Sequence, residues 1–110
     1  MATTLLDLYR MGNATSARLD HVRPSKDVIV FERNSAPWVA GRSGGISTFS
    51  VVGAQPGPWW RLPAGSPYND TLLLVWNDHG EHWSWEPAAD MPLAIYQAAL
   101  ELVNRGFVRV

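Results

Sequence analysis

Short apolar or alternating stretches recur along the chain, and this pattern is typical of β-strands. The run from Thr71 to Trp76 is apolar after its first residue, which predicts a strand covered on both faces. In the next stretch, His82, Ser84 and Glu86 alternate with tryptophans, so the three polar residues should share one strand face. Further strands are predicted over residues 5–11, 28–31, 38–40, 46–52, 59–62 and 107–110.

Two segments have the features of helices. Apolar residues recur at helical spacing from Leu93 to Val103, after Asp90 as an N-cap and before Gly106 as a stop. A shorter helix is predicted from Asn13 to Leu19, because this segment begins with residues that cap helices well. Strands and helices together predict an α+β domain with a mostly antiparallel sheet.

The stretch from Arg42 to Val52 combines a flexible loop with the start of a strand. Gly44 and Gly45 permit positive φ angles and a close approach of the backbone to a ligand. Ser47 and Thr48 follow where a rigid strand still lets side chains reach a ligand. We interpret this stretch as a site, although a polar strand start after a surface turn has the same pattern.

The composition indicates one globular domain, residues 1–110. A chain of 12.2 kDa with 46% hydrophobic and 17% charged residues can fold around a single core. Its net charge of −1 gives no strong electrostatic footprint for nucleic acid or for an anionic membrane. Cysteine is absent from the sequence, which suits a reducing cytosol and excludes thiolate metal sites.

The sequence also bears on where the protein acts. The first ten residues carry no basic region followed by an apolar run, so no signal peptide is predicted. No apolar stretch approaches the roughly 20 residues that span a bilayer. We therefore expect a protein of the cytoplasm that needs dedicated secretion machinery to leave its cell.

Tryptophan is abundant, and five of the six tryptophans lie between positions 59 and 85. Such residues build either a compact core or an aromatic-lined cleft, because the ring is large and its N–H needs a partner. A non-enzymatic binding module with an exposed aromatic platform is therefore an alternative function.

Other site chemistries have weaker support. The segment Asp78–His82 contains two histidines three positions apart, but a turn and a strand start do not bring them to one face, so we predict no metal site. A small ribonuclease-like site could use Glu81 or Glu86 with His82, Arg10 and Arg42. That alternative lacks the basic surface that RNA binding requires.

Arg10 lies in a predicted strand that is apolar on both faces. A buried arginine needs a partner such as a carboxylate or a phosphate, so it is either an ion-pair anchor or a ligand clamp. Together with the hydroxyls of Ser47 and Thr48 and the carboxylate of Glu86, it suits a dinucleotide with a cleavable glycosidic bond.

Four short motifs occur in an order that points to a known family. They are Leu-Tyr-Arg at 8–10, Gly-Gly-Ile-Ser-Thr-Phe at 44–49, Leu-Pro-Ala-Gly-Ser-Pro at 62–67 and His-Trp-Ser-Trp-Glu-Pro at 82–87. In this order the chain resembles the cytoinhibitory type VI secretion effectors that have an ADP-ribosyltransferase-like fold. One departure is Ile46, which stands where those effectors can have a further hydroxyl.

The resemblance implies a growth-inhibitory bacterial toxin that uses NAD as co-substrate to transfer ADP-ribose to a cytosolic acceptor. It also implies a cognate immunity or antitoxin protein that covers the cleft, and action in the cytoplasm of the producer or of a target cell. By the same resemblance Ser47 and His82 are expected catalytic residues. Glu86, with Glu81 as the second choice, is the catalytic glutamate expected of ADP-ribosyltransferases in general. The expected cofactor-binding residues are Arg10, Ser47, Thr48 and Trp60.

Overall fold

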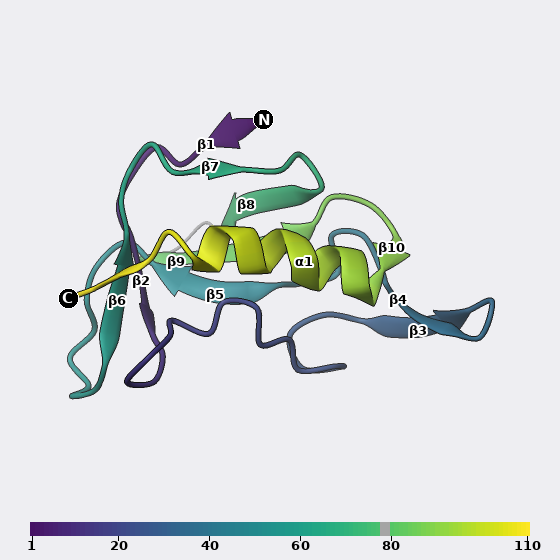
Figure 1. The fold of residues 1–110 in the computed structure, drawn as a ribbon, viewed down its shortest axis with the longest axis horizontal. Helices are drawn as coiled ribbons and strands as arrows, with labels where there is room; N and C mark the ends of the chain where they lie inside the picture. The colour runs from purple at the N-terminus through teal and green to yellow at the C-terminus, as the bar shows by residue number, and fades with distance from the viewer. Residues whose placement is uncertain (78–79) are drawn as a thin grey trace.

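The structure, a computed structural model, describes residues 1–77 and 80–110. Within these ranges the chain forms eleven strands and one helix (Figure 1). They are β1 (Ala2–Thr3), β2 (Leu8–Met11), β3 (Val30–Arg33), β4 (Ala36–Val39), β5 (Ile46–Phe49), β6 (Trp59–Leu62), β7 (Pro67–Tyr68), β8 (Leu72–Trp76), β9 (His82–Pro87), β10 (Met91–Pro92), α1 (Leu93–Asn104) and β11 (Val108–Arg109).

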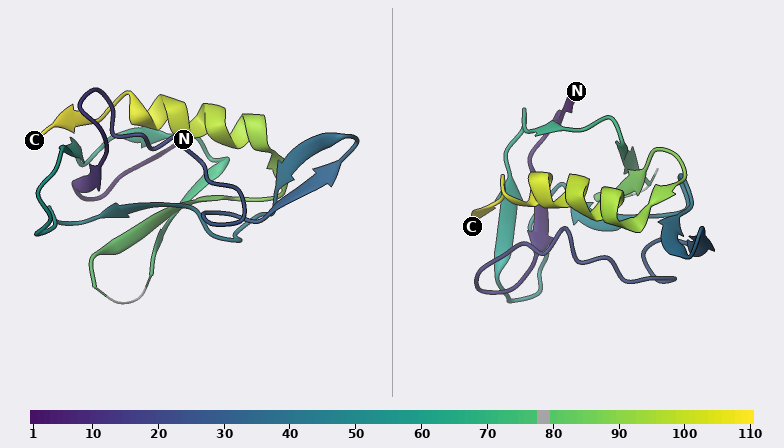
Figure 2. Two further views of the ribbon diagram at one scale, coloured as in Figure 1. Left: turned by 90° about the horizontal axis from the view of Figure 1, so that it is seen from below. Right: turned by 45° about the vertical axis from the view of Figure 1, so that its right-hand side comes forward.

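The main sheet has the strand order β11-β6-β2-β5-β9-β8 over the described residues, and every pairing in it is antiparallel. Helix α1 lies along one face of this sheet, as both views in Figure 2 show. A smaller sheet, β10-β4-β3, extends the molecule to one side, and β1 pairs with β7. The prediction of an α+β fold with mostly antiparallel sheets is confirmed.

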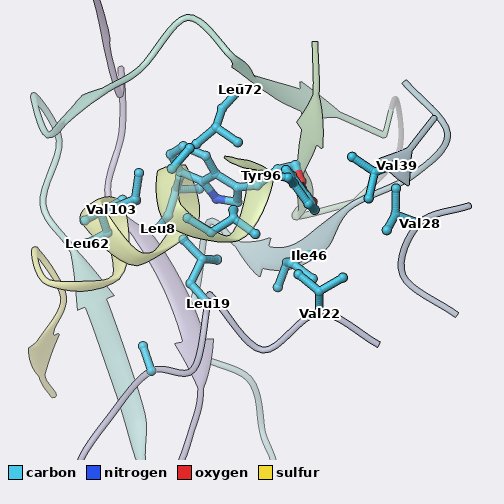
Figure 3. Close-up of a cluster of buried hydrophobic side chains, with 14 of the residues drawn as sticks. Leu8, Leu19, Val22, Val28, Val39, Ile46, Leu62, Leu72, Tyr96 and Val103 are labelled. Carbon is cyan, nitrogen blue, oxygen red and sulfur yellow. Dashed lines mark hydrogen bonds between the residues drawn. The ribbon is translucent and has the colours of Figure 1, made fainter. Parts of the chain in front are cut away.

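The core lies between α1 and the sheet (Figure 3). Tyr96 and Leu100 of the helix are fully buried, together with Leu8, Leu62 and Trp85 from three strands. Tyr96 also donates a 2.6 Å hydrogen bond from its hydroxyl to the carbonyl oxygen of Trp85, and burial raises the pKa of this hydroxyl. The helix is therefore held to the sheet by packing and by a buried polar contact.

The bounds of α1 confirm the predicted C-terminal helix, but its first turn differs from the prediction. The N-cap is Pro92 and makes no side-chain capping bond. Asp90, the expected cap, accepts a hydrogen bond from the backbone N–H of Gly41 instead. Its carboxylate thus links the start of the helix region to the β4–β5 loop.

Within the described residues, no helix is long and apolar enough to cross a membrane.

Several strands agree with the predicted ranges, and others are shorter. The strands expected at 59–62, 82–86 and 107–110 are present as β6, β9 and β11. The strand predicted from residue 5 begins at Leu8, as β2, and β5 ends at Phe49, so Val51 and Val52 lie exposed in the following loop. In β8, Leu72 is buried and the next three residues are half-buried, but Trp76 is 47% exposed, so the expected cover on both faces is incomplete.

The short helix predicted from Asn13 to Leu19 is wrong. Asn13 Oδ1 accepts hydrogen bonds from the backbone N–H groups of Thr15 and Ser16, at 2.9 and 2.8 Å. Such side-chain bonds offer the backbone an alternative to helix formation. Arg18 has a φ angle of 60°, in the left-handed region, which also interrupts a helix at this point.

The β3–β4 hairpin is tighter than the sequence indicates. Strands were expected at residues 28–31 and 38–40 with a longer loop between them, but the described strands run to Arg33 and from Ala36. Asn34 and Ser35 form the turn with φ angles of 52° and 60°. Two consecutive positive φ angles are typical of a type I′ hairpin turn, in which asparagine is favoured.

The buried Tyr96 hydroxyl gives a direct test of the fold. We expect Tyr96→Phe to lower the free energy of unfolding by about 1–3 kcal/mol, because the Trp85 carbonyl would lose its buried donor. The measurement is urea denaturation followed by tryptophan fluorescence. Tyr9→Phe is the matched control, since its hydroxyl has no described hydrogen bond and its loss should change stability little. Equal effects of the two substitutions would contradict the role of the Tyr96 contact.

Candidate functional site

Alternation along β5 separates the two hydroxyls that the sequence placed together. Thr48 is fully buried on the helix side of the sheet, where it donates to the carbonyl oxygen of Trp83 and accepts from Trp85 Nε1. Ser47 lies on the opposite face with Phe49. Thr48 is therefore a core residue in this structure, and we do not assign it a ligand.

On the outer face of the sheet, which is the face away from α1, Ser47 meets His82. Antiparallel pairing sets Phe49 opposite His82 and Ser47 opposite Ser84. Ser47 and His82 are therefore diagonal neighbours on the two strands. Ser47 Oγ lies 2.7 Å from His82 Nε2, which is a hydrogen-bond distance, and the histidine tautomer decides which of the two atoms donates. The His82 ring also packs against Phe49, with ring centroids 5.5 Å apart. A serine hydroxyl and an imidazole are thus held in one geometry by two rigid strands.

Arg10 lies beside Ser47, where β2 and β5 diverge. In the described structure these two strands share the single register pair Tyr9 and Phe49, whereas β2 pairs with β6 along all four residues. The Arg10 guanidinium donates from Nη1 to the carbonyl oxygen of Ser47 at 2.7 Å. It also donates to the carbonyl oxygens of Ala17 and Arg18, at 2.9 and 3.3 Å. The arginine therefore fills the fork between the strands.

These partners differ from the carboxylate or phosphate that the sequence indicated for a buried arginine. Carbonyl oxygens satisfy hydrogen-bond donors but carry no net charge to balance the guanidinium. Burial lowers the pKa of Arg10, and the nearby Asp27 carboxylate opposes this shift. Because three of the five guanidinium N–H groups have these partners, two remain for another acceptor.

A cleft of about 510 Å³ opens next to this arrangement. Its wall is largely apolar, with Phe49 from β5, Met11 from β2 and Trp59 from β6. Arg10 and Glu81 bring the charged groups, and Val51, Gly53 and Gln55 of the β5–β6 loop complete the lining. Glu81 accepts a hydrogen bond from the Ser50 hydroxyl. The cleft thus joins an apolar surface to one cation and one carboxylate.

Trp59 lines the cleft, whereas Trp60, the expected cofactor residue, does not. The period of two in β6 sends these neighbours to opposite faces. Trp60 is the register partner of Arg10, packs against the core and donates from Nε1 to the carbonyl oxygen of Asn13 at 2.9 Å. Trp59 donates from Nε1 to the carbonyl oxygen of Gln55. The sequence shows that one of the two must face outward, but it does not show which.

Glu86 is on the same strand as His82 but lies farther along it. Four residues of strand rise separate the two by about 13 Å. Glu86 accepts a hydrogen bond from Ser84 Oγ at 3.1 Å, and it is not among the residues that line the cleft. Of the two glutamates that the sequence indicated, Glu81 is therefore the one at the cleft.

Gly44 and Gly45, the two glycines before β5, lie against the backbone of other segments. A Cβ atom at Gly45 would lie 2.0 Å from the carbonyl oxygen of Trp85, and one at Gly44 would lie 2.5 Å from that of Asp27. Gly44 also has a φ angle of 128°. The close backbone approach that was expected at a ligand is thus an approach to the protein's own chain.

This geometry does not support the ribonuclease-like site or the exposed aromatic platform that the sequence left open. Arg42 precedes β5, whereas His82 pairs with the last residue of that strand, so the ribonuclease-like set is not brought together. The tryptophans are dispersed among the core, the cleft and the surface, so they form no continuous platform. Trp85 is buried, Trp60 and Trp83 pack against the core, Trp38 lies under Arg33, Trp59 lines the cleft and Trp76 is half-exposed.

The predicted absence of a metal site is only partly examined by the structure. Among the described residues no group of three potential metal ligands is found. Asp78 and His79, part of the histidine-containing turn considered above, lie outside those residues.

Comparison with known proteins adds to this geometry. Residues 6–109 match the family model described as Tse2 ADP-ribosyltransferase toxin. No curated protein matches the chain.

The Arg10 fork can be tested by stability. We expect Arg10→Ala to lower the free energy of unfolding by about 3 kcal/mol or more, because three carbonyl oxygens lose their donor and a gap opens between β2 and β5. Arg61→Ala on the neighbouring strand β6 is the matched control. Its side chain is exposed, so the expected change is within about 0.5 kcal/mol.

Chemical denaturation of both variants gives the comparison. If Arg10→Ala unfolds at the same denaturant concentration as Arg61→Ala, the guanidinium does not hold the fork together.

Proposed function

The chain belongs to the Tse2 ADP-ribosyltransferase toxin family, and on that basis we propose that it transfers ADP-ribose from NAD to a cytosolic acceptor. The observation that carries this proposal is the hydrogen-bonded pair of Ser47 and His82. The pair lies outside the lining of the apolar cleft but adjoins it, because His82 packs against Phe49 and the Ser47 carbonyl accepts from Arg10, and both partners line the cleft together with Glu81. These groups match the needs of a reaction that breaks a glycosidic bond next to a pyrophosphate.

NAD has an apolar aromatic end and an anionic centre, and the cleft offers a surface for each. The nicotinamide ring packs against Phe49 and Trp59, since aromatic rings attract one another in offset or edge contacts. The two uncommitted N–H groups of Arg10 bind pyrophosphate oxygens, for which a guanidinium is a strong partner. Ser47 then lies close to the nicotinamide ribose and fixes its orientation by hydrogen bonding.

The reaction breaks the bond between ribose C1′ and the nicotinamide nitrogen, and nicotinamide leaves with the bonding electrons. Positive charge develops on the ribose, and the Glu81 carboxylate stabilises it. A nucleophilic atom of the acceptor then forms the new bond to C1′ and gives up its proton. We assign the acceptance of that proton to His82, because its Nε2 is within hydrogen-bond distance of the Ser47 hydroxyl.

The family description as a toxin supports a biological setting for this chemistry. We propose that the protein is delivered as a type VI effector, acts in the cytosol of a target cell and is neutralised in its producer by a cognate immunity protein. That partner covers the cleft and so keeps NAD out.

Competition between NAD and the immunity protein for the free toxin would test this arrangement, and simultaneous binding of both would contradict it.

Replacing Ser47 tests the transfer reaction. We expect Ser47→Ala to reduce the rate of nicotinamide release from NAD about 10²- to 10³-fold, because a preorganised polar group at the reacting ribose is lost. The measurement is nicotinamide release by the purified protein, together with growth of bacteria that express it alone. Ser35→Ala, in the turn of the distant β3–β4 hairpin, is the control and should keep both activities.

Growth arrest that persists in Ser47→Ala, with no NAD turnover by the unsubstituted protein, would contradict the proposal. In that case the cleft would serve another reaction.

The two glutamates give a separate prediction. We expect Glu81→Gln to lower nicotinamide release about 10²-fold or more, because the amide cannot stabilise a positive charge. Glu86→Gln should have little effect, since its carboxylate bonds to Ser84 and lies outside the cleft lining. Both exchanges keep the shape of the side chain, so each variant controls for the other. The reverse result would assign the catalytic carboxylate to Glu86.

A further inference from the structure

The segment between β2 and β3 presents positive charge on one side of an ordered chain. Its apolar residues Ala17, Leu19 and Val22 are buried in the core. Arg18, His21 and Arg23, which lie between or after them, are exposed, and the intervening Asp20 is half-buried. The buried residues therefore fix the segment to the domain, while the basic residues face solvent together.

Hydrogen bonds hold this segment in place along the domain. The backbone N–H of Leu19 donates to Asn104 Oδ1 at 2.9 Å, and Asn104 Nδ2 donates to Ser16 Oγ at 3.1 Å. Ser16 Oγ in turn accepts from the backbone N–H of Arg18 at 2.9 Å. The last residue of α1 thus sets the conformation from which Arg18 projects.

The basic side chains line a pocket of about 480 Å³. Its described lining consists of four basic residues and no acidic one, and the four are Arg10, Arg18, His21 and Arg23, with Met11 and Gly12 completing the wall. Three of the nine lysines and arginines of the chain therefore meet in one hollow, although the net charge of the whole protein is −1. We call this hollow the basic pocket.

Two carboxylates near the basic pocket offset part of its charge. Asp27 is committed to Arg23, whose Nη2 and Nε lie 3.0 and 3.2 Å from its two oxygens. Asp27 also acts on Arg10 more strongly than Arg23 and Arg18 do, whereas Asp20, which is half-buried, acts on Arg10 more weakly. Among the described residues Arg18 forms no salt bridge, so its charge is available to a bound anion.

Arg10 connects the basic pocket to the apolar cleft, because it lines both. Its guanidinium has two N–H groups beyond those bonded to the backbone carbonyls. A ligand at the basic pocket can therefore share Arg10 with a ligand in the cleft.

We propose that the basic pocket is a phosphate-binding site, in which Arg18, His21 and Arg23 bind a phosphate group together with Arg10. Guanidinium groups bind phosphate oxygens by short, charge-assisted hydrogen bonds, and several of them converge here on a fixed backbone. The identity of the phosphate rests on the proposed function. It is either the pyrophosphate of NAD itself or a phosphate of the molecule that receives ADP-ribose.

The test uses inorganic pyrophosphate as the probe and the full chain as the protein. Isothermal titration calorimetry should show saturable binding to the unsubstituted protein. We expect Arg18→Gln to weaken the affinity about tenfold, because one charge-assisted hydrogen bond is lost. His21→Gln should weaken it in the same direction, and neither exposed side chain is needed for packing.

Arg61→Gln is the matched control, since it removes one exposed arginine on strand β6 and should leave the affinity unchanged. Absence of saturation at millimolar pyrophosphate would overturn the proposal. Equal weakening in Arg18→Gln and Arg61→Gln would also overturn it, because the binding would then follow overall charge rather than this pocket.

A second titration distinguishes the two sources of the phosphate. If NAD displaces pyrophosphate, and Arg18→Gln weakens NAD binding as well, the pocket holds the dinucleotide's own pyrophosphate. If pyrophosphate still binds in the presence of saturating NAD, the pocket holds a phosphorylated acceptor. Neither result depends on turnover, so pyrophosphate binding that survives in Ser47→Ala separates this site from the transfer reaction.

Discussion

The candidate site depends on the hydrogen bonds that the Arg10 guanidinium donates to backbone carbonyl oxygens. The guanidinium occupies the gap where β2 and β5 diverge and donates to the carbonyl oxygens of Ser47, Ala17 and Arg18. One side chain therefore ties the strand that carries Ser47 to the segment that carries Arg18. Since carbonyl oxygens leave its charge uncompensated, the same residue that joins the two strands also provides a cation at the cleft.

Successive residues of a strand face opposite sides of the sheet, so the residues that stabilise the core differ from those of the candidate site. On the helix side, Thr48 bonds to two tryptophans and Tyr96 bonds to the Trp85 carbonyl, so this face is closed and rigid. On the outer face, Ser47 and His82 meet beside Phe49. Because neighbouring residues face opposite sides of the sheet, the geometry of the Ser47 and His82 pair is set by a core that lies on the other side.

Features that depend on local periodicity could be predicted from the sequence. The helix from Leu93, the strand from Ile46 and the strand from His82 follow from spacing alone, and the order of short motifs was sufficient to indicate the family. The polar face of β9 also followed from a period of two. What this period could not supply was the choice between Trp59 and Trp60, because either register satisfies it.

Features that depend on partners distant in sequence could not be predicted. Gly45 is required by the backbone of Trp85, 40 positions later, and Asn104 orders the segment around Ser16 from the far end of the chain. The predicted helix at Asn13 failed for a local reason, since its side chain bonds to the backbone in a competing turn. The role of Arg10 required both kinds of information, because its carbonyl partners belong to two separate segments.

The net charge of the chain does not show how its charged residues are distributed over the folded surface. A net charge of −1 argues against a broad electrostatic surface, yet folding gathers Arg10, Arg18 and Arg23 around one hollow. The adjacent cleft is lined mainly by apolar side chains. The surface therefore changes from apolar to cationic across a single arginine, Arg10, which lines both hollows. Local order in the segment after β2, rather than composition, creates this polarity.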